Sequence, residues 1–192
     1  LSLHDALPIS IEQAREQVAA AVDAAPSEVI FTANGSEANN LLIQGLARAH
    51  RAETGEALQL ACATTEHPCV LAPMRALQNE GFAYHELPVD TQGVISPQAL
   101  ASLPKQTTLV SVMTANNETG VVQNVAELAS TFRGSHQGWF HSDAVQAFGK
   151  HPLSFRALNA AGVDALTVSA HKVGGPKGAA ALVRDRAAGV AA

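Results

Sequence analysis

The chain has 192 residues, of which 47% are hydrophobic and 4% aromatic, a composition that suits one α/β domain with a core rich in alanine and leucine. The formal net charge of -5 includes no basic block, and no apolar run reaches the roughly 18 residues that span a bilayer, so we expect neither nucleic acid nor a membrane as a partner. Cys62 and Cys69 form no disulfide framework and the histidines no metal-ligand spacing, so we expect no metal site and a reducing cytoplasm as the location.

The first ten residues differ in character from the rest. Residues 1–10 (LSLHDALPIS) lack an initiator methionine, a basic region and a helical period continuous with the next segment, and they do not form a signal peptide. The decapeptide is similar to the translation of a common sequencing-adapter oligonucleotide. We therefore expect residues 1–10 to be a non-native segment and residues 11–192 to be the domain.

Hydrophobic periodicity predicts that strands and helices alternate about six times. The connections are long enough for right-handed crossovers, so the expected fold is a three-layer α/β architecture with a mostly parallel sheet covered by helices. Strands are expected over 29–32, 58–64, 82–87, 107–113, 139–143 and 165–168, and helices over 11–25, 38–51, 68–77, 97–103 and 125–132.

The turn after the first expected strand joins small residues to the start of a helix. Gly35 and Ser36 offer free backbone N–H groups there, and Ser36 adds a hydroxyl. These groups and the helix dipole favour a phosphate. The alternative is a plain capped helix with Ser36 as the N-cap.

A lysine follows the strand expected over 165–168, in the segment SAHKVGGPKG. An amine in a glycine-rich turn with apolar neighbours loses solvation of its charged form, so Lys172 should be nucleophilic at neutral pH and able to form a Schiff base. The alternative is that Lys172 and Lys177 are ordinary surface lysines.

Polar residues also follow other expected strands: His67, Asn117 and Asp143, with Gln146 three residues further on. Individually, His67 could be a cap or packing group and Asn117 a turn residue. The carboxyl ends of parallel strands share one edge, so we expect all these residues to form one site. A phosphate turn, a histidine, a carboxylate and Lys172 are the groups that pyridoxal 5'-phosphate (PLP) requires.

Five segments in this order and spacing resemble the class V aminotransferase family, specifically its cysteine desulfurase branch: FTANGSEANN, TTEHPCVL, TANNETGVVQ, HSDAVQAFGK and SAHKVGGPKG. The resemblance covers nearly everything from Val29 to Arg184. It implies the large domain of fold-type-I PLP-dependent transferases, here incomplete, with a mostly parallel, mixed sheet of seven strands. It also implies a homodimer with the active site near the subunit interface.

The resemblance assigns a role to each matching residue. Lys172 would hold the cofactor and move a proton at the substrate α-carbon, and His67 would stack on the ring; these two are the expected catalytic residues. Asp143 would pair with the pyridinium nitrogen, Gln146 would hydrogen-bond the phenolic oxygen, and Asn117 would support the ring. The phosphate would be bound by Gly35, Ser36, Ser169 and His171.

The implied reaction converts L-cysteine to L-alanine and leaves the sulfur as a persulfide on a separate enzyme cysteine. It implies iron–sulfur cluster assembly as the context and a sulfur-acceptor protein as a partner. That cysteine and the arginine for the substrate carboxylate are expected beyond residue 192, so we expect a fragment. Cys69 does not match the persulfide carrier, and we expect it to pack in the interior, as we do Cys62. Ser36 and Val145 stand where threonine is common in the family.

Several alternatives remain. The chain could catalyse another reaction of the family, selenocysteine lysis or aminotransfer, or it could be an inactive PLP-binding fragment. A non-catalytic nucleotide-binding module would require a G-x-G-x-x-G turn, which residues 33–38 (ANGSEA) lack.

Overall fold

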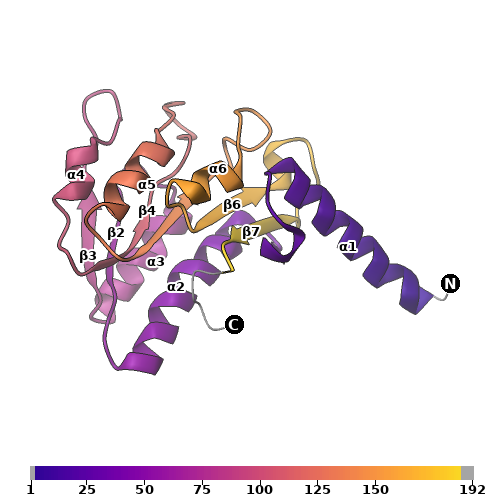
Figure 1. Cartoon of the computed structure of the whole chain (residues 1–192), viewed down its shortest axis with the longest axis horizontal. Helices are drawn as coiled ribbons and strands as arrows, with labels where there is room; N and C mark the ends of the chain where they lie inside the picture. The colour runs from indigo at the N-terminus through magenta and orange to yellow at the C-terminus, as the bar shows by residue number, and fades with distance from the viewer. Residues whose placement is uncertain (1–2, 187–192) are drawn as a thin grey trace.

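Seven strands form one mixed sheet in a computed structural model, which describes residues 3–186 (Figure 1). Their order across the sheet is β1-β7-β6-β5-β4-β2-β3. β7 is antiparallel to both neighbours, and the other pairs are parallel. The expected α/β fold with a mixed seven-stranded sheet is therefore confirmed. The strands are β1 (Val29–Thr32), β2 (Gln59–Ala63), β3 (Ala83–Leu87), β4 (Thr107–Ser111), β5 (Trp139–Asp143), β6 (Ala165–Ser169) and β7 (Ala180–Arg184).

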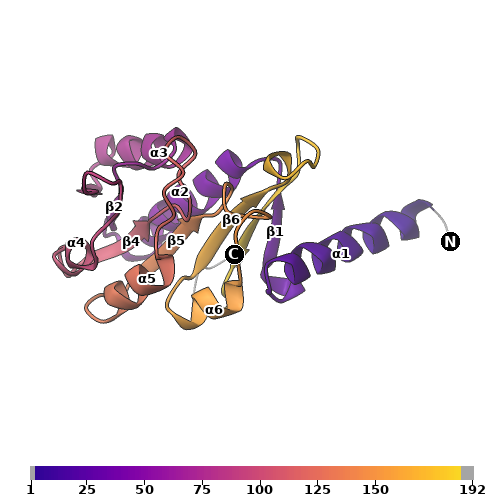
Figure 2. The ribbon, with the colours of Figure 1, turned by 90° about the horizontal axis from the view of Figure 1, so that it is seen from above.

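Helices cover both faces of the sheet and complete three layers (Figure 2). On one face, Leu42 of α2 and Met74 of α3 share a core with Leu60 of β2. On the other, Phe132 of α5 packs with Phe140 of β5, their ring centroids 6.0 Å apart. The α-helices are α1 (Leu3–Ala21), α2 (Gly35–Thr54), α3 (Pro68–Asn79), α4 (Pro97–Ala101), α5 (Val125–Arg133) and α6 (Phe155–Ala160).

Capping explains where the observed helices differ from the predicted ones. α2 begins at Gly35 rather than residue 38, because Asn34 and not Ser36 is the N-cap. α1 ends at Ala21, before the expected residue 25, as Asp23 adopts a left-handed φ of 53°. α6 was not predicted, because six residues are too few for a clear helical period.

α1 begins at Leu3 and includes residues 3–10 of the segment expected to be non-native, whose first two residues lie outside the described chain. This continuity contradicts the expected break in helical period after residue 10, while the domain boundary there remains a prediction. The helix extends away from the sheet in Figure 1, and Ala19 near its end belongs to the core. Neither α1 nor any other helix of the described chain has the length and apolar character to cross a bilayer.

Candidate active site

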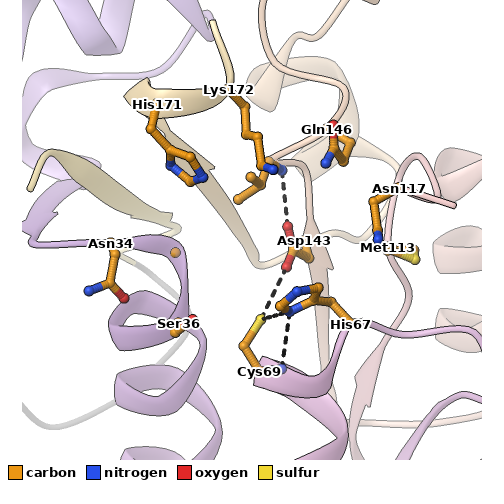
Figure 3. Close-up of a pocket in the computed structure, with 12 residues that line it drawn as sticks. Asn34, Ser36, His67, Cys69, Met113, Asn117, Asp143, Gln146, His171 and Lys172 are labelled. Atoms are coloured by element: carbon orange, nitrogen blue, oxygen red, sulfur yellow. Dashed lines mark hydrogen bonds between the residues drawn. The ribbon is translucent and has the colours of Figure 1, made fainter. Parts of the chain in front are cut away.

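The segments that follow β1, β2, β4, β5 and β6 meet at one edge of the sheet and surround a cavity of about 270 Å³ (Figure 3). These five strands run in the same direction, so the segments after them share this edge. All the predicted site residues except Ser169 line the cavity. The lining residues are Asn34, Gly35, Ser36, His67, Cys69, Met113, Asn117, Asp143, Val145, Gln146, His171 and Lys172.

The N-terminus of α2 forms one wall. The side chain of Asn34 caps it by accepting a hydrogen bond from the Glu37 N–H (2.8 Å). The N–H groups of Gly35 and Ser36 have no acceptor within residues 3–186. A Cβ on Gly35 would lie 3.0 Å from Val145 Cγ2, so glycine allows the start of α2 to approach the segment after β5 closely. The free donors and the dipole of this 20-residue helix suit an anion.

A buried carboxylate, that of Asp143 at the end of β5, faces the same cavity. Its Oδ1 accepts from the Val145 N–H (3.0 Å), and its Oδ2 accepts from the side-chain amide of Asn39 (2.8 Å). Burial raises the pKa of Asp143, although these hydrogen bonds oppose the shift. No salt bridge reaches Asp143 within the described chain. A cation bound beside it would stabilise the charged carboxylate.

His67 is the N-cap of α3 and contacts Cys69. Its Nδ1 accepts from the Cys69 N–H (3.2 Å) and lies 3.0 Å from Cys69 Sγ. Cys69 is half-buried: it packs against the core, as expected, but it also lines the cavity, whereas Cys62 is fully buried as expected. Burial, together with the charge of Asp143, raises the pKa of Cys69 to about 11, so its thiol is protonated at neutral pH.

Lys172 and His171 belong to a 3-10 turn, Ala170–Lys172, that follows β6. Both residues line the cavity (Figure 3). Lys172 is exposed, so the expected desolvation by apolar neighbours is wrong, because the glycine-rich turn does not cover it. Ser169 is buried and does not line the cavity. Its Oγ lies 2.8 Å from His171 Nδ1 and so orients that imidazole.

The bend after β4 separates its two asparagines. Asn116 Oδ1 accepts from the N–H groups of Glu118 (2.9 Å) and Thr119 (2.8 Å) and thereby builds the turn. Asn117 faces the cavity, as does Gln146 from the segment after β5. The adjacent asparagines therefore have different tasks, which the sequence could not distinguish.

Sequence reasoning missed a layer of residues around the cavity. Asn39 is fully buried one turn into α2, and Glu66 is 4% exposed just before His67. Glu66 accepts a hydrogen bond from the Met113 N–H, and burial, followed by the charge of Asp143, raises its pKa to about 8. Both residues stand within the recognised segments, but only packing shows what they touch. The lining residues not predicted are Asn34, Cys69, Met113 and Val145.

The sequence predicts no metal site, and the structure can be searched for clusters of ligating side chains. Across residues 3–186, no group of three or more His, Cys, Asp or Glu could hold a metal ion.

Comparison with known proteins identifies the family. The model of the family aminotransferase class V matches residues 2–192. The mitochondrial cysteine desulfurase of Drosophila melanogaster is 45% identical over 179 residues, which are 92% of this chain and 37% of that protein. A solved NifS-like protein has a TM-score of 0.91 and 32% identity over 99% of this chain and 51% of its own. SspA in complex with cysteine has a TM-score of 0.84 and 35% identity, over 94% of this chain and 50% of its own.

These matches define a PLP-dependent enzyme class of the transferase type. The chain belongs to the class V aminotransferase family, in its cysteine desulfurase branch. The expected family, enzyme class and cofactor are therefore confirmed. The chain spans about a third of the length of the curated relatives it matches.

The predicted cytoplasmic location is wrong. The relatives from Drosophila melanogaster, Eremothecium gossypii and Arthroderma benhamiae are all named as mitochondrial. The prediction used cysteine content, which reports on the redox environment and does not distinguish one reducing compartment from another.

Proposed function

We propose that this chain carries the cofactor site of a cysteine desulfurase, which uses PLP to convert L-cysteine to L-alanine. The observation that carries the proposal is that Lys172, Asp143, His67 and the start of α2 face one cavity. The name of the Drosophila relative and the SspA structure with cysteine support L-cysteine as the substrate.

The groups that face the cavity fit the two ends of PLP. At the anionic end, the free N–H groups of Gly35 and Ser36 and the side chain of His171 can donate to phosphate oxygens. At the ring end, Asp143 is a buried carboxylate without a salt bridge in the described chain, and a protonated pyridine nitrogen is the cation it lacks.

Bound PLP supplies a ring that draws electrons and stabilises negative charge at the α-carbon of an attached amino acid. The protein would control the charge and protons around it. Asp143 would stabilise a protonated ring nitrogen, and His67 would cover the ring. The amine of Lys172 would hold the cofactor and would be the group that moves a proton at the substrate α-carbon.

Sulfur transfer needs a separate nucleophile. A thiolate attacks the sulfur of the substrate, a sulfur–sulfur bond forms, the carbon–sulfur bond breaks with its electrons on carbon, and that carbon takes a proton to give L-alanine. Cys69 is unsuited to this attack, because its thiol is protonated at neutral pH and its Sγ lies 3.8 Å from Asp143 Oδ2.

The proposal extends to partners of the whole protein. The family resemblance of the five sequence segments is the support for a homodimer, a sulfur-acceptor protein and a place in iron–sulfur cluster assembly.

Spectroscopy tests the proposal on the 192-residue chain. We expect added PLP to give a visible absorption band, and borohydride to fix the cofactor to Lys172, as located by peptide mass spectrometry. Lys172→Ala should lose the band. The matched control is Lys177→Ala, which removes a lysine five residues away that does not line the cavity. A folded chain without a band, or a band that survives Lys172→Ala, would overturn the proposal.

A further inference from the structure

Asp143 and His67 are joined by a short chain of hydrogen bonds through Asn39 and Cys69. Asn39 Nδ2 lies 2.8 Å from Asp143 Oδ2 and 3.0 Å from Cys69 Sγ. Cys69 Sγ lies 3.0 Å from His67 Nδ1 (Figure 3). The four residues come from α2, the start of α3 and the end of β5, so three elements converge here.

The chemistry of these groups sets the direction of each bond. Asn39 Nδ2 has two hydrogens, one for Asp143 Oδ2 and one for the sulfur. His67 Nδ1 accepts the Cys69 N–H, so it carries a lone pair and cannot donate to the sulfur. The sulfur therefore accepts from Asn39, and its single hydrogen has two acceptors within reach, His67 Nδ1 at 3.0 Å and Asp143 Oδ2 at 3.8 Å. The imidazole is held in the tautomer with its hydrogen on Nε2.

The burial of Asn39 indicates a task beyond packing. Its side chain is fully buried, yet its Oδ1 has no hydrogen-bond partner within the described chain. An unpartnered buried polar atom costs about 1–3 kcal/mol. The reverse orientation of the amide would place its oxygen against the Asp143 carboxylate. An apolar residue would avoid this cost but would remove the amide donor of Asp143 Oδ2 and leave it only the longer contact with Cys69 Sγ.

We propose that Asn39 and Cys69 are positioning residues that hold Asp143 and His67 in a fixed mutual geometry for the cofactor ring. The inference rests on the proposed PLP site. It assigns Cys69 the role of a neutral hydrogen-bond bridge, which explains a protonated thiol that faces the cavity.

The test measures PLP affinity and the visible circular dichroism of the bound cofactor, which reports the orientation of its ring. In the 192-residue chain, Cys69→Ala should weaken PLP binding on the order of tenfold, as expected for the loss of one or two hydrogen bonds, and should change the dichroism. Cys69→Ser keeps an acceptor and a donor, so it should restore both signals to nearly wild-type values. Cys62→Ala is the matched control, since it removes a buried thiol outside the cavity.

Asn39→Leu removes the α2 side of the same hydrogen-bond bridge. It is the deciding variant if Cys69→Ala does not fold. It should weaken binding to a similar extent, with folding checked by far-ultraviolet circular dichroism. Wild-type affinity and dichroism in a folded Cys69→Ala or Asn39→Leu chain would overturn the inference, and so would a failure of Cys69→Ser to rescue. If the wild-type chain shows no Lys172-dependent band, the proposed function fails and this inference with it.

Discussion

The buried polar residues beneath the cavity reduce the stability of the fold, because their charged forms lose solvation, but they also shape the site. Glu66 and Asp143 are carboxyl groups that are almost fully buried, and burial raises the pKa of each. Their charges also oppose each other. A cation bound beside Asp143 would offset the cost of burying its charge. Glu66 avoids the same cost because it stays protonated.

Glu66 should make the stability of the chain dependent on pH. Its folded pKa of about 8 lies above the model-peptide value of 4.5. The neutral carboxyl therefore stabilises the fold fully below about pH 4.5, and this contribution is lost as the pH rises toward 8. Glu66→Gln removes the titration, so its free energy of unfolding should fall less than that of the wild type between pH 5 and 8, by on the order of 3 kcal/mol.

Urea unfolding at the two pH values gives the comparison. Glu56→Gln, a change at an exposed carboxylate, is the control and should keep the wild-type slope. An equal change in the free energy of unfolding between pH 5 and 8 for Glu66→Gln and the wild type would show that Glu66 is charged over this whole interval and that its pKa is not raised.

Two features of the central strands hold β4, β5 and β6 in register below the site. His141 of β5 is fully buried, and its two ring nitrogens lie 2.9 Å from Ser111 Oγ of β4 and 3.0 Å from Thr167 Oγ1 of β6. Burial lowers the pKa of His141 to about 3, so the imidazole is neutral. Gly138, just before β5, approaches the backbone of β4 closely.

His141→Phe should destabilise the chain by about 2 kcal/mol. Phenylalanine fills the space but leaves the hydroxyls of Ser111 and Thr167 without this partner. The readout is the midpoint of urea unfolding. His151→Phe at the exposed surface is the control, and an equally small effect of both changes would contradict a role for the bridge.

Gly138→Ala should be more damaging than Gly45→Ala. A Cβ at Gly138 would lie 2.8 Å from Thr108 Cα, a backbone atom that cannot turn aside, so we expect a loss of about 2–3 kcal/mol. A Cβ at Gly45 in α2 meets nothing within 4 Å, so Gly45→Ala should gain up to about 1 kcal/mol through helix propensity. Thermal unfolding of the two variants should therefore shift in opposite directions.

At the scale of the whole molecule, the cavity depends on the entire sheet. Its walls follow five different strands and include the starts of α2 and α3. Because no one segment contains the site, a ligand bound there stabilises the complete fold and not a local part of it.

PLP should accordingly raise the unfolding temperature. At a free concentration one hundred times its Kd, PLP should raise the free energy of unfolding by about 2.7 kcal/mol. For a chain of this size, this corresponds to a rise in the unfolding temperature of roughly 5–10 °C. Differential scanning fluorimetry with and without PLP measures the shift. Pyridoxal without the phosphate is the control and should have a smaller effect, because it cannot use the donors of α2. An equal shift of the unfolding temperature with both compounds would show that the start of α2 does not bind the phosphate group.

Much of the candidate site could be predicted from residues beside strand ends. Gly35, His67, Asp143 and Lys172 each follow a strand with a clear hydrophobic signal, and parallel strands deliver such residues to one edge. The predicted burial of Lys172 was wrong, and the exposure of Cys69 to the cavity was not predicted, because the exposure of a side chain depends on neighbours distant in sequence.

The sequence alone determined the alternation of strands and helices, the family and most of the residues that line the cavity, since local periodicity and short motifs encode them. Only the tertiary structure revealed the bridge from Asp143 through Asn39 and Cys69 to His67 and the raised pKa of Glu66. The hydrogen bond between Asn39 and Asp143 joins residues 104 positions apart, and the desolvation of Glu66 arises from the packed neighbours around it. No local pattern in the chain records either.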